Sequence, residues 1–154
     1  MMAVSIVSRQ CVVPVSTPRL ARTAERALAA LGRPAGDVEI LIVGDTEIAG
    51  MNARFLRVAT PTDVLAFPLE VPGAAGGLLG QVVISADTAR RQARRLDVPV
   101  ALELDLLATH AILHLVGYDD RDPLEAELMH RREREILSTA RSVPERLWQG
   151  LLPA

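Results

Sequence analysis

The sequence VALELDLLATHAILHLVGYDD, residues 100–120, is an apolar helical run that carries two of the three histidines of the chain. His110 and His114 are four residues apart, which places both imidazoles on one face of an α-helix, about one turn apart. Gly117 can adopt the left-handed conformation that ends a helix, and the chain can then fold back toward the rings. The stretch predicts a helix over residues 100–116 and a metal site of the pattern His-x3-His-x5-Asp, with Asp120 as the third ligand.

Strand and helix patterns alternate on both sides of this helix, giving about four strands and five helices. Strands are predicted over residues 4–7, 11–15, 38–43, 64–67 and 79–84, the first two as one strand or a hairpin. Helices are predicted over residues 17–31, 45–55, 100–116 and 122–139, the first with Thr17 as its N-cap. A further helix is predicted to follow a cap at Ser85 or Asp87. We expect the last helix to bury Leu124, Leu128, Ile136 and Leu137.

Length and composition limit the class of protein. The 154 residues predict a single domain over 1–154, with the tail after about residue 144 held loosely except where Leu147 and Trp148 pack. Aromatic residues make up 3% and the net charge is −2, which argues against a base-stacking or broadly cationic nucleic-acid binder. The single cysteine, Cys11, excludes an internal disulfide and fits a cytoplasmic setting. No segment approaches the roughly 20 continuous apolar residues of a membrane span.

The metal-site pattern has the outline of the zinc-protease motif H-E-x-x-H-x-x-G-x-x-H, with two changes. Ala111 replaces the glutamate that acts as general base, which argues against a peptidase that uses a base on that helix, and Asp120 replaces the third histidine. An aspartate oxygen is a competent zinc ligand, and three protein ligands leave the fourth position open, as catalytic zinc sites require. Other candidates for the third ligand are Asp119, Asp122 and His130. We expect Asp119 to orient a ligand imidazole and His130 to lie on a solvated helix surface.

At these residues the chain resembles the YbeY family of bacterial endoribonucleases. The family motif H-G-x-L-H-L-x-G-Y-D-H corresponds to residues 110–120, HAILHLVGYDD. The family's P-T-D-V-L-S-F-P corresponds to residues 61–68, PTDVLAFP, and its L-G-D-I-x-I-S to residues 79–85, LGQVVIS. Asn52 stands where the family has a helix asparagine. The resemblance covers about residues 38–137.

The resemblance implies an α+β fold, with a small mixed sheet against helices and the metal in a cleft on the central helix. It also implies zinc-dependent cleavage of single-stranded RNA, in ribosomal RNA maturation and quality control, with one Zn²⁺ per chain. The implied partners are precursor rRNA and ribosomal subunit proteins in the cytoplasm. The family has an arginine four residues after the asparagine, and Leu56 occupies that position here. Arg57, one place later, is our candidate for the same catalytic role, with Arg54 as the alternative.

Candidate RNA contacts are weighed against ordinary structural roles. One predicted helix carries a cluster of arginines, namely Arg90, Arg91, Arg94 and Arg95. These side chains are either phosphate contacts beside the cleft or a solvated face paired with nearby acids. Thr62 and Asp63 either position substrate or bond the local backbone of a turn. The general base is open between Asp119 and the 2′-hydroxyl of the substrate.

Two rival functions use the same residues. Two histidines and one carboxylate also form the facial triad of non-haem iron enzymes, which would place the chain among oxygenases. A ribosome-associated protein that keeps the metal for stability alone would be non-catalytic. Metal analysis and chelation separate these hypotheses from a nuclease.

Overall fold

The computed structural model describes residues 3–33, 37–56, 64–68, 78–140 and 142–150 of the chain. Within these residues four strands form one mixed sheet in the order β1-β2-β4-β3. Strands β1 (Ala3–Ser8), β2 (Asp37–Val43) and β4 (Leu78–Ser85) are parallel, and β3 (Val64–Pro68) is an edge strand antiparallel to β4. The described helices are α1 (Thr17–Ala30), α2 (Asp45–Leu56), α3 (Ala86–Leu96), α4 (Val100–Leu115), α5 (Pro123–Ser138) and the 3₁₀ helix η1 (Glu145–Gly150). The predicted α+β fold is confirmed.

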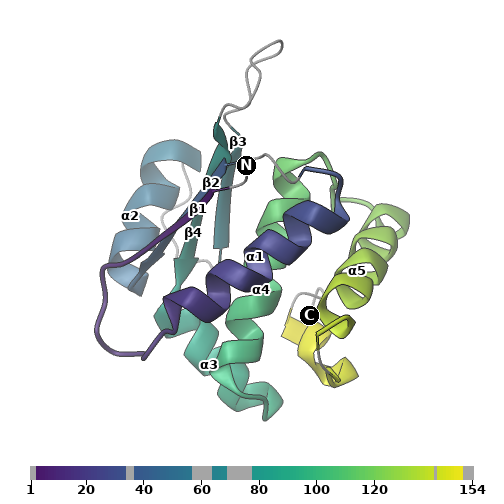
Figure 1. Cartoon of the computed structure of the whole chain (residues 1–154). Coiled ribbons are helices and arrows are strands. Elements are labelled where there is room, and N and C mark those ends of the chain that lie inside the picture. Colours follow the sequence, from purple (N-terminus) through teal and green to yellow (C-terminus); the bar gives the residue numbers. More distant parts are fainter. Residues whose placement is uncertain (1–2, 34–36, 57–63, 69–77, 141, 151–154) are drawn as a thin grey trace.

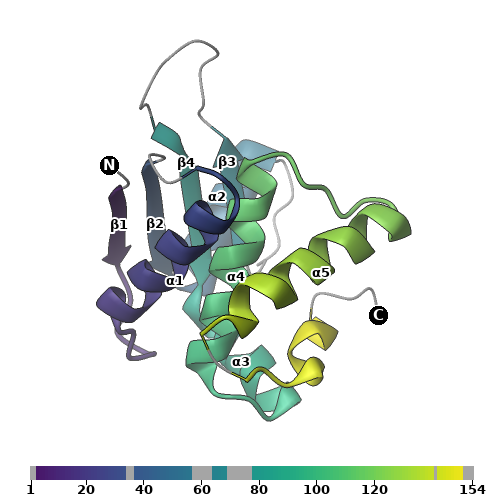
Figure 2. The same cartoon turned by 45° about the vertical axis from the view of Figure 1, so that its right-hand side comes forward.

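The sheet lies between two helical layers, with α1 and α4 on one face and α2 on the other (Figure 1 and Figure 2). Alternation along each strand produces this arrangement, because successive side chains point to opposite faces of a sheet. In β4, Val82 and Ile84 belong to the core under α1 and α4. Val83, between them, packs with Ile48 of α2. Burial of both faces explains why β2 and β4 read as nearly continuous apolar runs.

Helix α4 is the centre of the molecule, and twelve of its sixteen residues are buried. A helix that is apolar on all sides is buried within a core, which is what the sequence VALELDLLATHAILHL produces. Gly80 of β4 allows α4 to approach the sheet, because a Cβ there would lie 2.5 Å from Leu115 Cδ2 and 2.7 Å from the Phe67 carbonyl oxygen. This close approach places the C-terminal end of α4 beside β3.

Side-chain caps define three of the helix starts. Ser16, one residue before the predicted Thr17, caps α1 by accepting a hydrogen bond from the Arg19 amide. Ser85 caps α3, and Asp122 caps α5 by accepting from the amides of the first turn. The predicted helix boundaries are otherwise met within about two residues, the range over which helix ends are normally uncertain.

The strand predicted over residues 11–15 is wrong. The side chain of Gln10 folds this segment into a compact turn: its Oε1 accepts from the amides of Val12 and Val13, and its Nε2 donates to the Val13 carbonyl. These bonds satisfy backbone groups that a strand would pair with a neighbour. The β-branched residues therefore bury Val13 without forming a ladder.

The predicted buried face of α5 is correct for Ile136 and Leu137 but wrong for Leu124 and Leu128, whose exposed fractions are 73% and 56%. The N-terminal end of α5 stands away from the sheet and from α4 (Figure 2). The buried face of α5 is instead built on Met129, His130 and Glu133 together with Ile136 and Leu137. Two polar residues, His130 and Glu133, therefore take core positions in the N-terminal part of this face, where the apolar pattern places Leu124 and Leu128.

The C-terminal part of the described chain packs against α3 and α4. Leu147 and Trp148 of η1 are buried in a second core with Leu96 and Leu106. The division of the chain into a single domain with a loose tail stays a prediction. Among the described helices, none is by itself long and apolar enough to cross a membrane; α3 and α4 reach that length only as a pair, and they are bent by 119° at the break between them.

Candidate metal centre

The C-terminal turn of α4 positions the two histidines and returns the chain toward them. Gly117 has a φ of +106°, a conformation that L side chains rarely adopt. The Gly117 amide donates to the His114 carbonyl and the Tyr118 amide to the Leu113 carbonyl, the paired bonds of a glycine-terminated helix. Because the helix ends in this tight reversal, Asp120 comes back over the last turn of α4.

The three predicted ligands meet at their polar atoms. His110 Nε2 and His114 Nε2 lie 3.1 Å apart, and Asp120 Oδ2 lies 3.4 Å from the first and 3.7 Å from the second. Tetrahedral ligands at the usual zinc distances of about 2.0–2.1 Å are separated from one another by about 3.3 Å. The donor set and its spacing therefore fit a single zinc ion.

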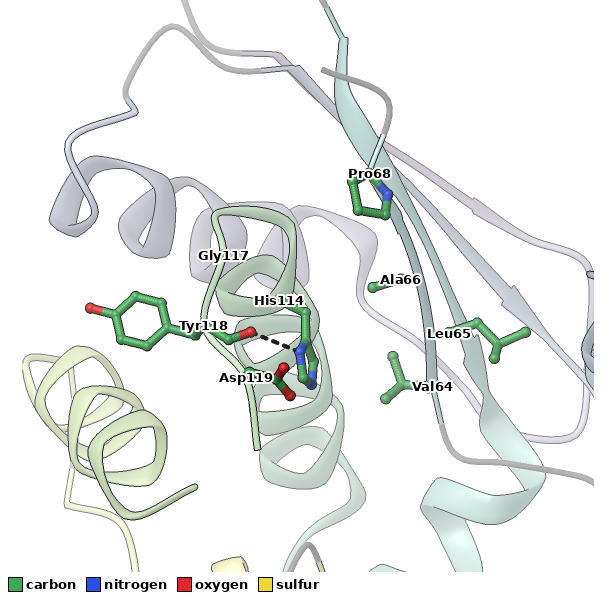
Figure 3. A pocket seen from close by; sticks show the side chains of 8 residues that line it. All are labelled: Val64, Leu65, Ala66, Pro68, His114, Gly117, Tyr118 and Asp119. Atoms are coloured by element: carbon green, nitrogen blue, oxygen red, sulfur yellow. Dashed lines mark hydrogen bonds between the residues drawn. The ribbon is translucent and has the colours of Figure 1, made fainter. Parts of the chain in front are cut away.

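Hydrogen bonds on the far side of each ring fix which nitrogen faces the other ligands. His114 Nδ1 donates to the Tyr118 carbonyl oxygen at 3.0 Å (Figure 3). His110 Nδ1 donates to Glu133 Oε2 at 2.6 Å. A neutral imidazole that donates through Nδ1 keeps its lone pair on Nε2, so both rings present a ligand atom to the same point. The hydrogen bonds that we expected from Asp119 come instead from Glu133 and from the Tyr118 carbonyl.

A second group of possible ligands lies behind the first. Among the residues that the structure describes, His110, His130 and Glu133 also bring three ligand atoms close together, and all three residues are buried. His130 Nδ1 lies 2.7 Å from Glu133 Oε1, and His110 Nδ1 lies 2.6 Å from Glu133 Oε2. These lengths are typical of charge-assisted hydrogen bonds and shorter than the separation of about 3.3 Å between ligands of one zinc ion. We therefore interpret this group as a hydrogen-bonded network that includes His110, and not as a second metal site.

His130 is the clearest correction to the sequence analysis at the site. The expectation that it is solvated is wrong, because its exposed fraction is 5% and its partner Glu133 is completely buried. In the sequence, Glu133 resembles the surface acids that alternate with arginines along α5. The signal that identifies it is helical spacing: Glu133 lies four residues after the buried Met129 and four before the buried Leu137.

The electrostatics of the group are strongly coupled. Burial lowers the pKa of His110, but hydrogen bonds to Asp120 and Glu133 outweigh it and raise the pKa to about 9. The hydrogen bond to His110 lowers the pKa of Asp120 to about 2. Burial raises the pKa of Glu133, yet His110 and His130 together hold it below its ordinary value. Both carboxylates are therefore anionic at neutral pH, and a cation entering the site displaces a proton.

One side of the ligand group is open to solvent. The exposed fractions of the His114 and Asp120 side chains are 30% and 37%, against 5% for His110. His114 and Asp119 line a pocket of about 490 Å³ between the end of α4 and β3 (Figure 3). The other residues lining this pocket are Val64, Leu65, Ala66, Pro68, Gly117 and Tyr118. Substrate can therefore approach the ligands from the side of β3.

Asp119 is held by its own turn. Its Oδ1 accepts from the amides of Asp120 and Arg121, and its Oδ2 accepts from Arg121 Nε at 2.6 Å. The hydrogen bond from Arg121 holds the pKa of this carboxyl below its usual range. Asp119 is thus an anionic wall of the pocket, next to the ligands.

The structure does not bring the arginine cluster of α3 to the ligand group. Helix α3 packs on the first half of α4, where Ala93 and Leu96 contact Leu106, while His114 lies in the last turn of α4 (Figure 1). Arg91 forms an ion pair with Asp45 at 2.7 Å, Arg90 is half-buried, and Arg94 and Arg95 are exposed.

Of the remaining candidate site residues, the structure describes only Asn52 and Arg54. Arg57, Thr62 and Asp63 lie outside the described residues. Asn52 lies on α2 with an exposed fraction of 6%.

Comparison with known proteins gives a consistent result. The sequence profile of the family described as Endoribonuclease YbeY matches residues 6–141. A protein named Endoribonuclease YbeY from Anaeromyxobacter sp. (strain Fw109-5) is 44% identical over 132 residues, covering 86% of this chain and 69% of the relative. Its namesake from Geobacter metallireducens is 42% identical over 143 residues, covering 89% and 95%. The solution structure of TM1509 from Thermotoga maritima is similar in fold, with a TM-score of 0.61, 21% identity and coverage of 98% and 91%.

Proposed function

Because this chain belongs to the endoribonuclease YbeY family, we propose that it cleaves single-stranded RNA with one zinc ion held by His110, His114 and Asp120. The observation that carries the proposal is the convergence of Nε2, Nε2 and Oδ2 within 3.1–3.7 Å of one another. The Nδ1 bonds to Glu133 and the Tyr118 carbonyl support it, because they turn both Nε2 atoms toward the same point. Family membership supports the substrate class.

A bound zinc ion would supply a Lewis acid that polarises a phosphoryl oxygen and lowers the pKa of a coordinated water. The residues of the chain would bind this ion and limit its contact with solvent. Buried His110 excludes solvent from one side, whereas the side chains of His114 and Asp120 are about one-third exposed and His114 lines the open pocket. Val64 and Ala66 form an apolar wall of the pocket on which an unpaired nucleobase can pack. A base in a duplex is already stacked on its neighbours, so this wall favours a single strand.

We propose Asp119 as the catalytic carboxylate at the pocket wall, with Arg57 as a contact to the phosphate that is cleaved. Asp119 lines the pocket with His114 and is anionic, so it can accept a proton from an attacking hydroxyl group. Its low pKa makes it a weak base, and the 2′-hydroxyl of the substrate is the alternative to Asp119. The attacking group is then either a water molecule or that 2′-hydroxyl. A 2′,3′-cyclic phosphate product would identify the 2′-hydroxyl as nucleophile, whereas linear ends without a cyclic intermediate would favour water.

In the cell, we propose precursor ribosomal RNA as the substrate, with ribosomal subunit proteins as partners and the cytoplasm as the location. Thr62, Asp63 and the α3 arginines Arg90, Arg91, Arg94 and Arg95 are proposed as further RNA contacts. The α3 arginines would act away from the ligand group, so their role is to hold the strand and not to touch the reacting phosphate.

The direct test is cleavage of an end-labelled single-stranded RNA by the zinc-loaded protein, the chelated protein and the His114→Ala variant. We expect cleavage by the first, loss in the other two, and recovery of the chelated protein on adding zinc. Glu127→Ala, which removes an exposed acid on α5, is the matched control and should cleave normally. Equal cleavage by wild type and His114→Ala would overturn the proposal, as would stoichiometric iron with oxygen-dependent turnover in anaerobically purified protein.

A further inference from the structure

The carboxylate of Glu133 on α5 is completely buried and accepts three hydrogen bonds. His110 Nδ1 donates to its Oε2 at 2.6 Å, while His130 Nδ1 and Trp148 Nε1 donate to its Oε1 at 2.7 Å and 3.1 Å. Burying a carboxylate is costly unless it is fully hydrogen-bonded. A carboxyl group at a core position of α5, where an apolar side chain would pack at no such cost, therefore requires an explanation beyond stability.

We propose that Glu133 is the residue that positions the ligand His110, and that Trp148 of η1 holds Glu133 in place for this task. The inference rests on the proposed function, and it extends the site from the last turn of α4 to α5 and the C-terminal 3₁₀ helix. Glu133 does not touch the metal position; it acts through the imidazole of His110.

The geometry of His110 shows what Glu133 accomplishes. The two ring nitrogens of His110 face two different carboxylates, Nδ1 toward Glu133 and Nε2 toward Asp120 at 3.4 Å. Without Glu133, a flip of the ring about its bond to Cβ would remove Nε2 from the ligand group at little cost. A carboxylate that accepts from Nδ1 fixes the tautomer and orientation and makes Nε2 a stronger donor to a metal.

His130 and Trp148 complete the arrangement by occupying the other oxygen. Both donate to Oε1, so Oε2 is left for His110. The His130 ring is stacked at 6.2 Å from His110, with an interplanar angle of 19°. Trp148 is itself fixed, with an exposed fraction of 2% and the guanidinium of Arg134 over its ring at 4.9 Å. The orientation of Glu133 is thus set by two elements, α5 and η1.

The test is the zinc affinity of the full chain, measured by competition with a chromophoric chelator. Glu133→Gln keeps the volume but replaces one acceptor oxygen with a donor NH₂ group, so it cannot accept from all three donors. We expect its zinc affinity to fall by about 10- to 100-fold. Glu135→Gln is the matched control, since Glu135 lies two residues away in an exposed ion pair with Arg132, and its zinc affinity should equal that of wild type.

A second variant and a spectroscopic measurement cover the case in which Glu133→Gln does not fold. Trp148→Phe keeps the aromatic packing and removes the Nε1 donor, so it should lose less zinc affinity than Glu133→Gln but more than Glu135→Gln. In the zinc-bound wild type, long-range ¹H–¹⁵N spectra of the histidines should show His110 protonated at Nδ1 and bound to metal through Nε2. A merely structural Glu133 would not determine this tautomer.

The outcomes separate this inference from the proposed function. Equal zinc affinities of wild type and folded Glu133→Gln, or a His110 ring bound to metal through Nδ1, would overturn the positioning role alone. If wild type does not bind zinc at all, both the inference and the proposed metal centre fail. A loss of affinity in Glu133→Gln that Glu135→Gln does not share confirms the inference.

Discussion

Asp120 is the single residue whose chemistry sets this site apart from a three-histidine centre. Its carboxylate is about one-third exposed and lies within 3.4–3.7 Å of both Nε2 atoms. An anionic ligand offsets more of the metal charge than an imidazole does, and it competes for the proton on His110. We therefore expect the identity of this one side chain to govern metal affinity.

Substitution at Asp120 gives the prediction at this scale. Asp120→Ala removes the proposed third ligand and should weaken zinc binding by at least about 10-fold, a loss seen even for residues that only support ligands. Asp120→His supplies a neutral imidazole and should retain or tighten zinc binding. Both are measurable by chelator competition, with Glu127→Ala as a control for loss of an exposed acid. Zinc binding by Asp120→Ala as tight as in wild type would place the third ligand elsewhere.

The same scale shows what sequence reasoning could and could not find. His110, His114 and Asp120 follow from spacing within one helix and the turn after it, so local rules suffice to bring them together. Glu133 is 23 residues from His110 in the chain, and its contact depends on how α5 packs against α4. A charged residue between arginines is normally a surface residue, and burial of Glu133 and His130 becomes evident only from the partners that neutralise them.

At the level of elements, the end of α4 is the feature on which the site depends. Gly117 has a φ of +106° and no atom near its missing Cβ, so strain rather than collision opposes a side chain there. Gly117→Ala should lower the free energy of unfolding by about 1–3 kcal/mol and weaken zinc binding, because the reversal that returns Asp120 is disturbed. Urea denaturation and chelator competition measure the two effects.

Gly50 provides the matched control for this substitution. It lies inside α2, is exposed, has no positive φ, and leaves open space within 4 Å of the point where a Cβ would lie. Gly50→Ala should therefore stabilise the protein by about 0.5–1 kcal/mol. If both substitutions change stability equally, the special role assigned to the turn at Gly117 is incorrect.

Helices α2 and α3 are joined by the carboxylate of Asp45. Its Oδ1 accepts from Ser85 and Thr88 at 2.7 Å each, and its Oδ2 pairs with Arg91 at 2.7 Å. Burial raises the pKa of Asp45, but the bonds from Arg91, Ser85 and Thr88 outweigh it and lower the pKa below 3.8. A carboxyl group with a lowered folded-state pKa stabilises the fold above its unfolded pKa and loses that effect as pH falls.

Asp45→Asn should accordingly be less stable than wild type by about 1 kcal/mol near pH 7, and the difference should shrink below about pH 4. Urea denaturation at several pH values checks this. Glu47 lies on the same helix as Asp45 and forms a more exposed ion pair with Arg9. Glu47→Gln should therefore lower the free energy of unfolding by less than about 0.5 kcal/mol. A difference for Asp45→Asn that is independent of pH would show that the ionised form is not what stabilises the contact.

The elements themselves were largely predictable, and the exceptions have physical causes. Strands 38–43 and 79–84 and helix 100–116 are strong patterns, since both faces of the sheet and all sides of α4 are buried. Residues 11–15 have strand propensity, but Gln10 supplies local hydrogen bonds that compete with a ladder. The orientation of α5 depends on its polar core contacts, which an apolar pattern does not contain.

For the whole molecule, the net charge of −2 means that no general positive field draws RNA to the surface. Attraction must come from local groups of arginine, and the exposed Arg94 and Arg95 of α3 form such a group. They lie at the opposite end of α4 from the ligand group, and a helix of this length spans about 24 Å. An RNA strand must therefore be several nucleotides long to engage both places.

The salt dependence of RNA binding tests this arrangement. Each phosphate contact to a single strand contributes about −0.7 to the slope of log K against log salt, so Arg94→Gln/Arg95→Gln should reduce the slope by about 1.4. The effect should vanish with a dinucleotide, which cannot reach α3. Arg22→Gln/Arg131→Gln removes the same charge from α1 and α5 and should change the slope little. An unchanged slope for the α3 variant on long RNA would assign these arginines to a solvated helix face, because only cations that displace counterions from phosphate contribute to the slope.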